Sequence, residues 1–303
     1  DQAYNSNETE GYLTFDNDTY DTSGAFLRND TVDQRKLNSL KTFTFNSRAS
    51  YTEPLSKTTF LEVNFGYRVN NSEALRNTFN KTFSGNVPKY EARDSLFSND
   101  YAFRINTMTG GLNLRVNKKS LVYSLGGNIS FADFRQTDLV KDSLYTYSFV
   151  NLFPRANFRY NLGPQRRISF NYSGNTRQPT LEQIQPIREN TDPLNIQIGN
   201  ANLKQEFRHN LSLNFSDYKV LTSRNVYLSA NFSMVDNAIS SSSFVDSVNR
   251  RTNQFVNVDG NYNMNLWMGY WFQIKKINLH MGMNGGLSAG KFHNFVNGLK
   301  NIN

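Results

Sequence analysis

Few side chains in this sequence could carry out acid–base or metal chemistry. The 303 residues include three histidines, His209, His280 and His293, and no cysteine. His280 lacks the neighbouring carboxylate and nucleophile that proton-transfer catalysis needs, and no histidine cluster suggests zinc ligation. The sequence therefore predicts no metal site, no cofactor and no enzymatic activity.

Three aspartates near the start could in principle bind calcium. Asp16, Asp18 and Asp21 lie close together in "FDNDTYDTSG", residues 15–24. This stretch lacks the mid-loop glycine and the terminal glutamate of an EF-hand loop. A polar surface loop is the favoured interpretation.

The positive charge is spread along the chain. Lys and Arg number 33 against 25 Asp and Glu, which gives a net charge of +8. The basic residues occur singly or in short pairs such as "NKKS" (117–120) and "QIKK" (273–276). A nucleic-acid surface would need a basic patch or stripe, so we expect no nucleic-acid partner.

Alternation of apolar and polar residues dominates the pattern. In "NYNMNLWMGY" (261–270), Tyr262, Met264 and Leu266 alternate with asparagines. Successive side chains of a strand point to opposite faces, so a period of two predicts strands with one apolar and one polar face. Helical spacing is nowhere sustained, and no apolar run is long enough for a membrane-spanning helix. The fold class is all-β.

The order of the connections favours an antiparallel transmembrane outer-membrane β-barrel. Its signature is a regular alternation of short periplasmic turns and long extracellular loops. A soluble sandwich with an aromatic core remains the alternative. The short connections are 52–57, 117–119, 163–166, 218–223 and 273–276, and the long ones are 71–99, 136–146, 177–206 and 237–252.

The parity of each strand assigns side chains to lipid or to a wet lumen. Charges in the lumen could select ions or hold a plug, or they could only solvate the wall. The residues expected to face lipid are Phe65, Tyr67, Leu125, Phe158, Tyr160, Phe170, Tyr172, Leu213, Phe232, Leu266 and Met268. Those expected to face the lumen are Arg48, Glu62, Arg68, Arg104, Arg115, Arg155, Arg159 and His280.

About ten strands are expected over residues 39–290, as a partial segment of a larger barrel. Residues 1–38 read as a polar, extracellular loop-like segment, and 291–303 as a truncated end or loop. The apolar parity changes within 106–111, which predicts a β-bulge there. In the long connection 177–206, the candidates for contact with a substrate or a surface lipoprotein are Pro179, Leu181, Pro193, Leu194 and Asn200.

One block of the sequence resembles a known family. "GPQRRISFNYSG", "TRQPTLEQIQP" and "NTDPLNIQIGNANLKQEF", all within 153–215, are similar to the large outer-membrane β-barrel domain of Bacteroidota, which resembles the barrel of TonB-dependent receptors. A second stretch, "SYTEPLSKTTFLEVNFGYRVNN" (50–71), is similar to an earlier hairpin of that family. The likeness covers most of 40–290.

The resemblance implies a nutrient importer of the Gram-negative outer membrane. In this family a plug inside the barrel binds substrate and engages TonB, and outer-membrane lipid surrounds the wall. No counterpart of the plug is recognisable in these residues. A non-transporting barrel is therefore the runner-up, acting as a subunit, scaffold or client of an envelope assembly or secretion complex. An outer-membrane enzyme and a soluble adhesin or lectin are weaker alternatives.

Overall fold

The computed structural model describes residues 1–20, 23–85, 87–95, 97–140, 142–184, 188–192, 195–219, 222–246 and 250–302. These residues form two β-sheets, one of twelve strands and one of six. The larger sheet is antiparallel throughout. No helix among the described residues is long and apolar enough to cross a membrane.

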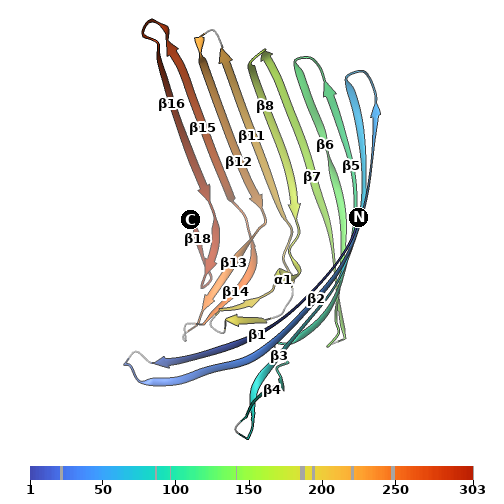
Figure 1. Cartoon of the computed structure of the whole chain (residues 1–303), viewed down its shortest axis with the longest axis vertical. Helices are drawn as coiled ribbons and strands as arrows, with labels where there is room; N and C mark the ends of the chain where they lie inside the picture. Colours follow the sequence, from blue (N-terminus) through green and yellow to red (C-terminus); the bar gives the residue numbers. More distant parts are fainter. Residues whose placement is uncertain are drawn as a thin grey trace.

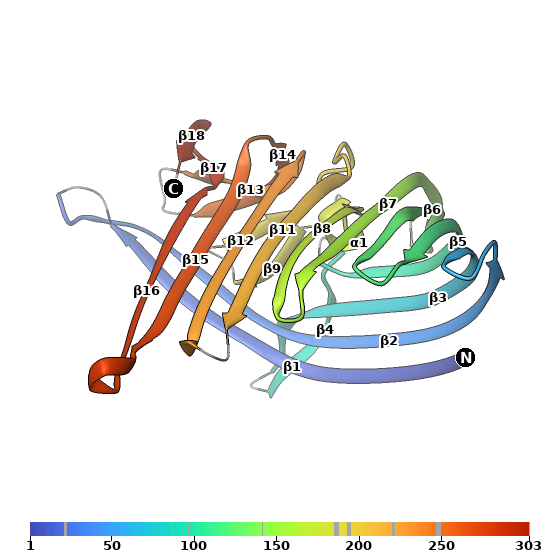
Figure 2. The same ribbon diagram turned by 90° about the horizontal axis from the view of Figure 1, so that it is seen from above.

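Eleven strands of the larger sheet pair in chain order and form what we call the wall. The wall curves into an open trough (Figure 2), and among the described residues β1 and β16 are its two edges. Its strands are β1 (Gln2–Tyr20), β2 (Phe26–Pro54), β3 (Thr59–Ser84), β5 (Asn99–Asn117), β6 (Leu121–Asp138), β7 (Ser143–Gly163), β8 (Arg166–Arg177), β11 (Glu206–Lys219), β12 (Arg224–Asp236), β15 (Asn261–Ile274) and β16 (Leu279–Lys291).

Short turns gather at one end of the wall, which we call the turn end. They join β2 to β3, β5 to β6, β7 to β8, β11 to β12 and β15 to β16, at the top of Figure 1. The last contains the 3-10 helix η2 (Lys275–Ile277), and Asn278 closes it with a left-handed φ of 51°. The longer connections lie at the opposite end of the wall, which we call the loop end.

The long connections contain more regular structure than the sequence suggests. The strands extend through much of 71–99 and 136–146, and β4 (Val87–Arg93) pairs with β3. The other long connections and residues 293–302 build the six-stranded sheet, in the order β18-β17-β13-β14-β10-β9. Its strands and the adjoining helix are α1 (Leu181–Ile184), β9 (Arg188–Asp192), β10 (Asn195–Ile198), β13 (Ala238–Val245), β14 (Arg251–Val258), β17 (His293–Val296) and β18 (Leu299–Ile302).

Both terminal segments differ from the expectation of loops. Residues 1–38 form β1 and the first part of β2, and residues 291–303 contain β17 and β18. β1 and β2 pair through their backbones, and polar contacts such as Arg35 Nε to Glu10 Oε1 at 2.8 Å join their side chains, so this hairpin does not depend on an apolar face. The period-two apolar pattern is therefore weak there, although the chain is extended.

The predicted bulge at 106–111 is wrong. The pairing of β5 with β3 and with β6 runs through this segment without a register shift. The parity changes because β5 has apolar residues on opposite faces at its two ends. Met108 and Leu112 lie on the face that is exposed, whereas Tyr101 and Phe103 are buried on the other face.

The buried aromatic side chains of the described wall gather in this cluster. Phe134, only 3% exposed, packs edge-on against Phe149 with ring centroids 5.3 Å apart. The Tyr101 and Phe103 rings lie 5.9 Å apart. Aromatic rings therefore fill the curved face near the loop end, while the same face toward the turn end remains polar.

Candidate binding site on the inner wall

The strand register separates the wall into two faces. Arg68 lies opposite Thr107, and Arg155 lies opposite Gly126 and Ser173. We call the face with these arginines the inner face. Seven of the residues expected to face the lumen share it by register: Arg48, Glu62, Arg68, Arg115, Arg155, Arg159 and His280.

Arg104 is the exception, and its predicted facing is wrong. It lies opposite Asn71 and Arg135 and shares the face of Met108. The prediction placed the expected bulge between Arg104 and Arg115, which gave both the same facing. Without a bulge, Arg104 and Arg115 have opposite parity, so Arg104 lies on the outer face. It lies nearer the loop end than the apolar stretch from Met108 to Val116.

The apolar residues expected to face lipid all share the outer face. Many are exposed in the chain, such as Leu125 at 63% and Met268 at 54%. On β5 the apolar stretch runs from Met108 to Val116, close to the roughly nine to eleven residues that a tilted strand needs to cross a bilayer. The full set is Phe65, Tyr67, Leu125, Phe158, Tyr160, Phe170, Tyr172, Leu213, Phe232, Leu266 and Met268.

A cavity of about 810 Å³ lies on the inner face, which is therefore the concave one. Six strands line it, from β2 to β8 without β4. Thr107, Thr109, Asn128 and Ser130 supply hydroxyls and amides from the central pair, β5 and β6. Four arginines line the cavity, and its lining contains no Asp or Glu: they are Arg48, Arg68, Arg155 and Arg177.

A second cavity, of about 520 Å³, continues along the inner face toward β15. Arg155 lines both cavities, so the two adjoin. Asparagine and serine dominate the second lining, with Asn171 donating to Ser212 Oγ at 3.1 Å. This part of the wall offers neutral donors and acceptors rather than charge.

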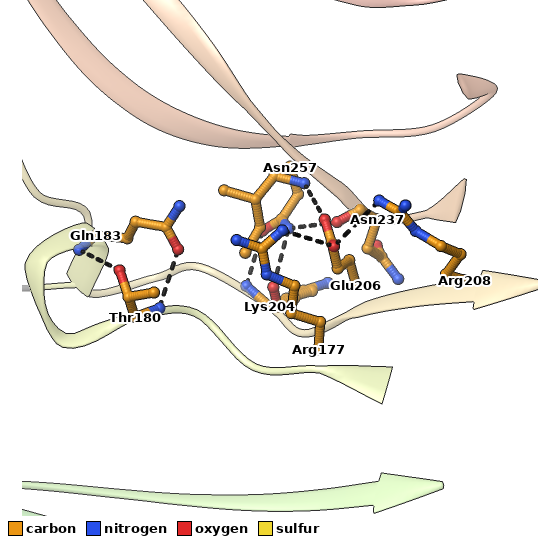
Figure 3. Close-up of polar contacts among 9 residues, drawn as sticks. Arg177, Thr180, Gln183, Lys204, Glu206, Arg208, Asn237 and Asn257 are labelled. Carbon is orange, nitrogen blue, oxygen red and sulfur yellow. Dashed lines mark hydrogen bonds and ion pairs between the residues drawn. The ribbon is translucent and has the colours of Figure 1, made fainter. Parts of the chain in front are cut away.

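A buried carboxylate joins the wall to the six-stranded sheet at the loop end (Figure 3). The side chain of Glu206 is 5% exposed, and it lies 3.5 Å from Arg177 and 3.8 Å from Arg208. Its Oε2 also accepts a hydrogen bond from the backbone N–H of Ile239, at 3.1 Å. Because Arg177 also lines the larger cavity, Glu206 helps to hold one cavity arginine in place.

Asn257 makes a second connection beside Glu206 (Figure 3). Its amide donates to the carbonyls of Lys204 and Asn237, at 3.0 and 2.8 Å, and its Oδ1 accepts from the Lys204 N–H at 2.7 Å. Asn237 has a positive φ of 50°, which asparagine tolerates at the tight turn between β12 and β13. These bonds fix β14 against the start of β11.

Side-chain hydrogen bonds stabilise the described parts of the connection 177–206 near residues 180–184 and 200. Thr180 and Gln183 form a reciprocal cap for α1, with the Thr180 N–H donating to Gln183 Oε1 at 2.9 Å and the Gln183 N–H to Thr180 Oγ1 at 3.3 Å (Figure 3). Asn200 takes no part in this cap. Its N–H donates to the Gln183 carbonyl at 2.6 Å and its amide to the Phe255 carbonyl at 2.9 Å.

Two of the five loop candidates thus have internal roles. Pro179 is fully buried, and Asn200 connects α1 to β14. Leu181 begins α1. Pro193 and Leu194 lie outside the described residues.

A chain of hydrogen-bonded side chains on the outer face was not predicted from the sequence. Tyr172 Oη lies 3.1 Å from His209 Nδ1, and His209 Nε2 lies 3.2 Å from Asp236 Oδ2. These three residues come from three adjacent strands, so only the register brings them together. Among the described residues, no group of three or more His, Asp or Glu side chains could hold a metal ion.

Comparison with known proteins agrees with this architecture. Residues 1–303 match the model of the Outer membrane protein beta-barrel family, and the chain belongs to that family. Its location is therefore the outer membrane of a Gram-negative bacterium. The search of curated proteins found no match.

Solved structures of TonB-dependent receptors show the same fold. The unliganded ferric citrate transporter FecA is 12% identical to this chain, with a TM-score of 0.53 over 96% of this chain and 40% of that chain. The copper transporter OprC is 10% identical, with a TM-score of 0.51 over 96% of this chain and 57% of that chain. The chain thus spans about half the length of these structural relatives or less.

Proposed function

We propose that this chain forms part of the wall of an outer-membrane importer of the TonB-dependent kind. The observation that carries the proposal is the division of the wall into an apolar outer face and a polar, cavity-bearing inner face. The outer face would contact membrane lipid through residues such as Leu125 and Met268. The inner face would border the path of a nutrient through a plugged lumen.

The fold supports this proposal beyond the division of faces. The neighbours FecA and OprC are named as transporters, and their similarity in fold extends over 96% of this chain. Turns at one end and a folded, six-stranded sheet at the other fit a periplasmic and an extracellular side. The loop-end sheet is the part best placed to meet a substrate or a surface lipoprotein first.

The test uses the full-length gene product, purified in detergent from its native outer membrane. We expect the detergent-purified protein to bind the purified periplasmic domain of TonB, and a plug segment to be required for this binding. A protein that never binds TonB, and that instead purifies in a fixed ratio with other envelope proteins, would contradict the importer. That result would favour a scaffold or client of an assembly complex.

A further inference from the structure

We propose that the arginine-lined cavity binds a small, multiply charged anion, so that the cargo of the importer is polyanionic. That the anion is the cargo rests on the proposed function, whereas the anion-binding site is argued from its own geometry. The site comprises Arg48, Arg68, Arg155 and Arg177 around the cavity of about 810 Å³.

The arginines approach the cavity from two sides. Arg48 and Arg68 come from β2 and β3, and Arg155 and Arg177 come from β7 and β8. Between these two pairs, β5 and β6 provide a floor of short hydroxyl and amide side chains. A guanidinium presents several N–H donors in a planar fork that matches carboxylate and phosphate oxygens. Two pairs facing across a neutral, hydrogen-bonding floor suit a solute with charge at both ends.

Three of the four arginines at this site have no carboxylate partner among the described residues. Among the described residues, Arg48, Arg68 and Arg155 form no ion pair, and only Arg177 approaches a carboxylate, at 3.5 Å from Glu206. Like charges gathered on a curved wall repel one another and raise the local potential. A bound anion would relieve that repulsion. The curvature of the wall directs the positive field of the arginines into the cavity.

The size of the cavity favours a small solute. Binding pockets for small molecules are typically about 300–1,000 Å³. An acidic protein segment, such as part of a plug, is the competing occupant of a basic wall. The thiol-labelling measurement distinguishes this protein occupant from a small solute.

The test is isothermal titration of the full-length, detergent-purified protein with inorganic pyrophosphate at low ionic strength. We expect saturable binding that weakens as salt is added, because exposed charges are screened. The triple variant Arg48→Gln, Arg68→Gln, Arg155→Gln should lose at least about tenfold in affinity, since hydrogen bonds to charged groups contribute strongly. Sucrose should not bind at this site.

The matched control changes arginines on the other face. Arg104→Gln with Arg135→Gln alters the same kind of charge on the outer face and should bind pyrophosphate as the unaltered protein does. Three results would overturn the proposal: no pyrophosphate binding at low salt, equal binding by the triple variant, or an equal loss in the outer-face control.

A second measurement detects a protein segment in the cavity. Residues 1–303 contain no cysteine, so Thr109→Cys adds to them one thiol, on the cavity floor. Pyrophosphate should slow its reaction with a maleimide in isolated outer membranes. A thiol that stays unreactive both with and without pyrophosphate would show that a protein segment fills the cavity, and would overturn the proposal of a small solute. Arginine-dependent binding without any TonB interaction would instead leave this site intact and refute only the importer.

Discussion

The carboxamide of Asn128 lies across the backbone of Gly111, its register partner on the neighbouring strand. A Cβ at Gly111 would come within 1.7 Å of Asn128 Oδ1 and 2.9 Å of the Gly127 carbonyl. Asn128 also lines the larger cavity. The glycine therefore makes room for a cavity side chain and does not serve a bulge.

This contact distinguishes two adjacent glycines. Gly111→Ala should push Asn128 from its position and reduce thermal stability, whereas Gly110→Ala should have little effect because a Cβ there meets nothing within 4 Å. We expect a cost of about 1–3 kcal/mol for the first change. The loss of the folded, heat-modifiable band on electrophoresis measures it. Equal behaviour of the two variants would contradict the arrangement.

The facing of β6 gives a second prediction. Leu125→Arg places a charge on the outer face, which costs roughly 2–4 kcal/mol at the middle of a bilayer. Ser124→Arg places it on the inner face opposite Arg115, where water reduces the repulsion. We expect the amount of assembled full-length protein in the outer membrane to fall for the first variant only. Equal assembly would show that the two faces are assigned wrongly.

The buried carboxylate of Glu206 gives a third prediction. Glu206→Ala leaves the Ile239 N–H without its acceptor, an omission that costs about 1–3 kcal/mol. Glu206→Gln keeps an acceptor and should cost less, because Arg177 and Arg208 are substantially exposed. Limited proteolysis between β8 and β11 should therefore be fastest for the alanine variant. The control is Glu91→Ala, which removes a carboxylate 72% exposed beside Lys89 and should change nothing measurable.

A fourth prediction concerns acid. The hydrogen bond from Lys81 Nζ, at 2.6 Å, and a second from Tyr90 Oη, at 2.8 Å, lower the pKa of Asp33 below its ordinary value. The stability from this group is therefore present above the unfolded-state pKa, about 3.9, and is lost as the pH falls through the lower folded-state pKa.

We expect pepsin to cut the β3–β4 hairpin faster as the pH drops below about 4. Asp33→Asn should be cut faster already at the higher pH values and should lose this step in the profile. An unchanged step in the asparagine variant would assign it to another group.

Strand positions and facing were predictable because each follows from local alternation. The faces of Phe158 and Arg159 follow from their even and odd positions alone. The alternation of short and long connections indicates that the short turns lie together at one end of the wall. Arg104 was misplaced because alternation cannot distinguish a bulge from an apolar patch on the other face. Glu206 meets Arg177, and His209 meets Tyr172, through the pairing of neighbouring strands, which local alternation does not reveal. Their roles therefore required coordinates.

The open margins of the wall limit how it can exist in a membrane. Along one side of β1 and one side of β16, no strand among the described residues takes up the backbone N–H and C=O groups. Hydrocarbon cannot hydrogen-bond these groups, so bilayer insertion requires the backbone of both margins to be paired with a strand. Membrane insertion and closure of the barrel must therefore occur together. An unclosed wall is expected to associate with other copies of itself through its exposed edge strands.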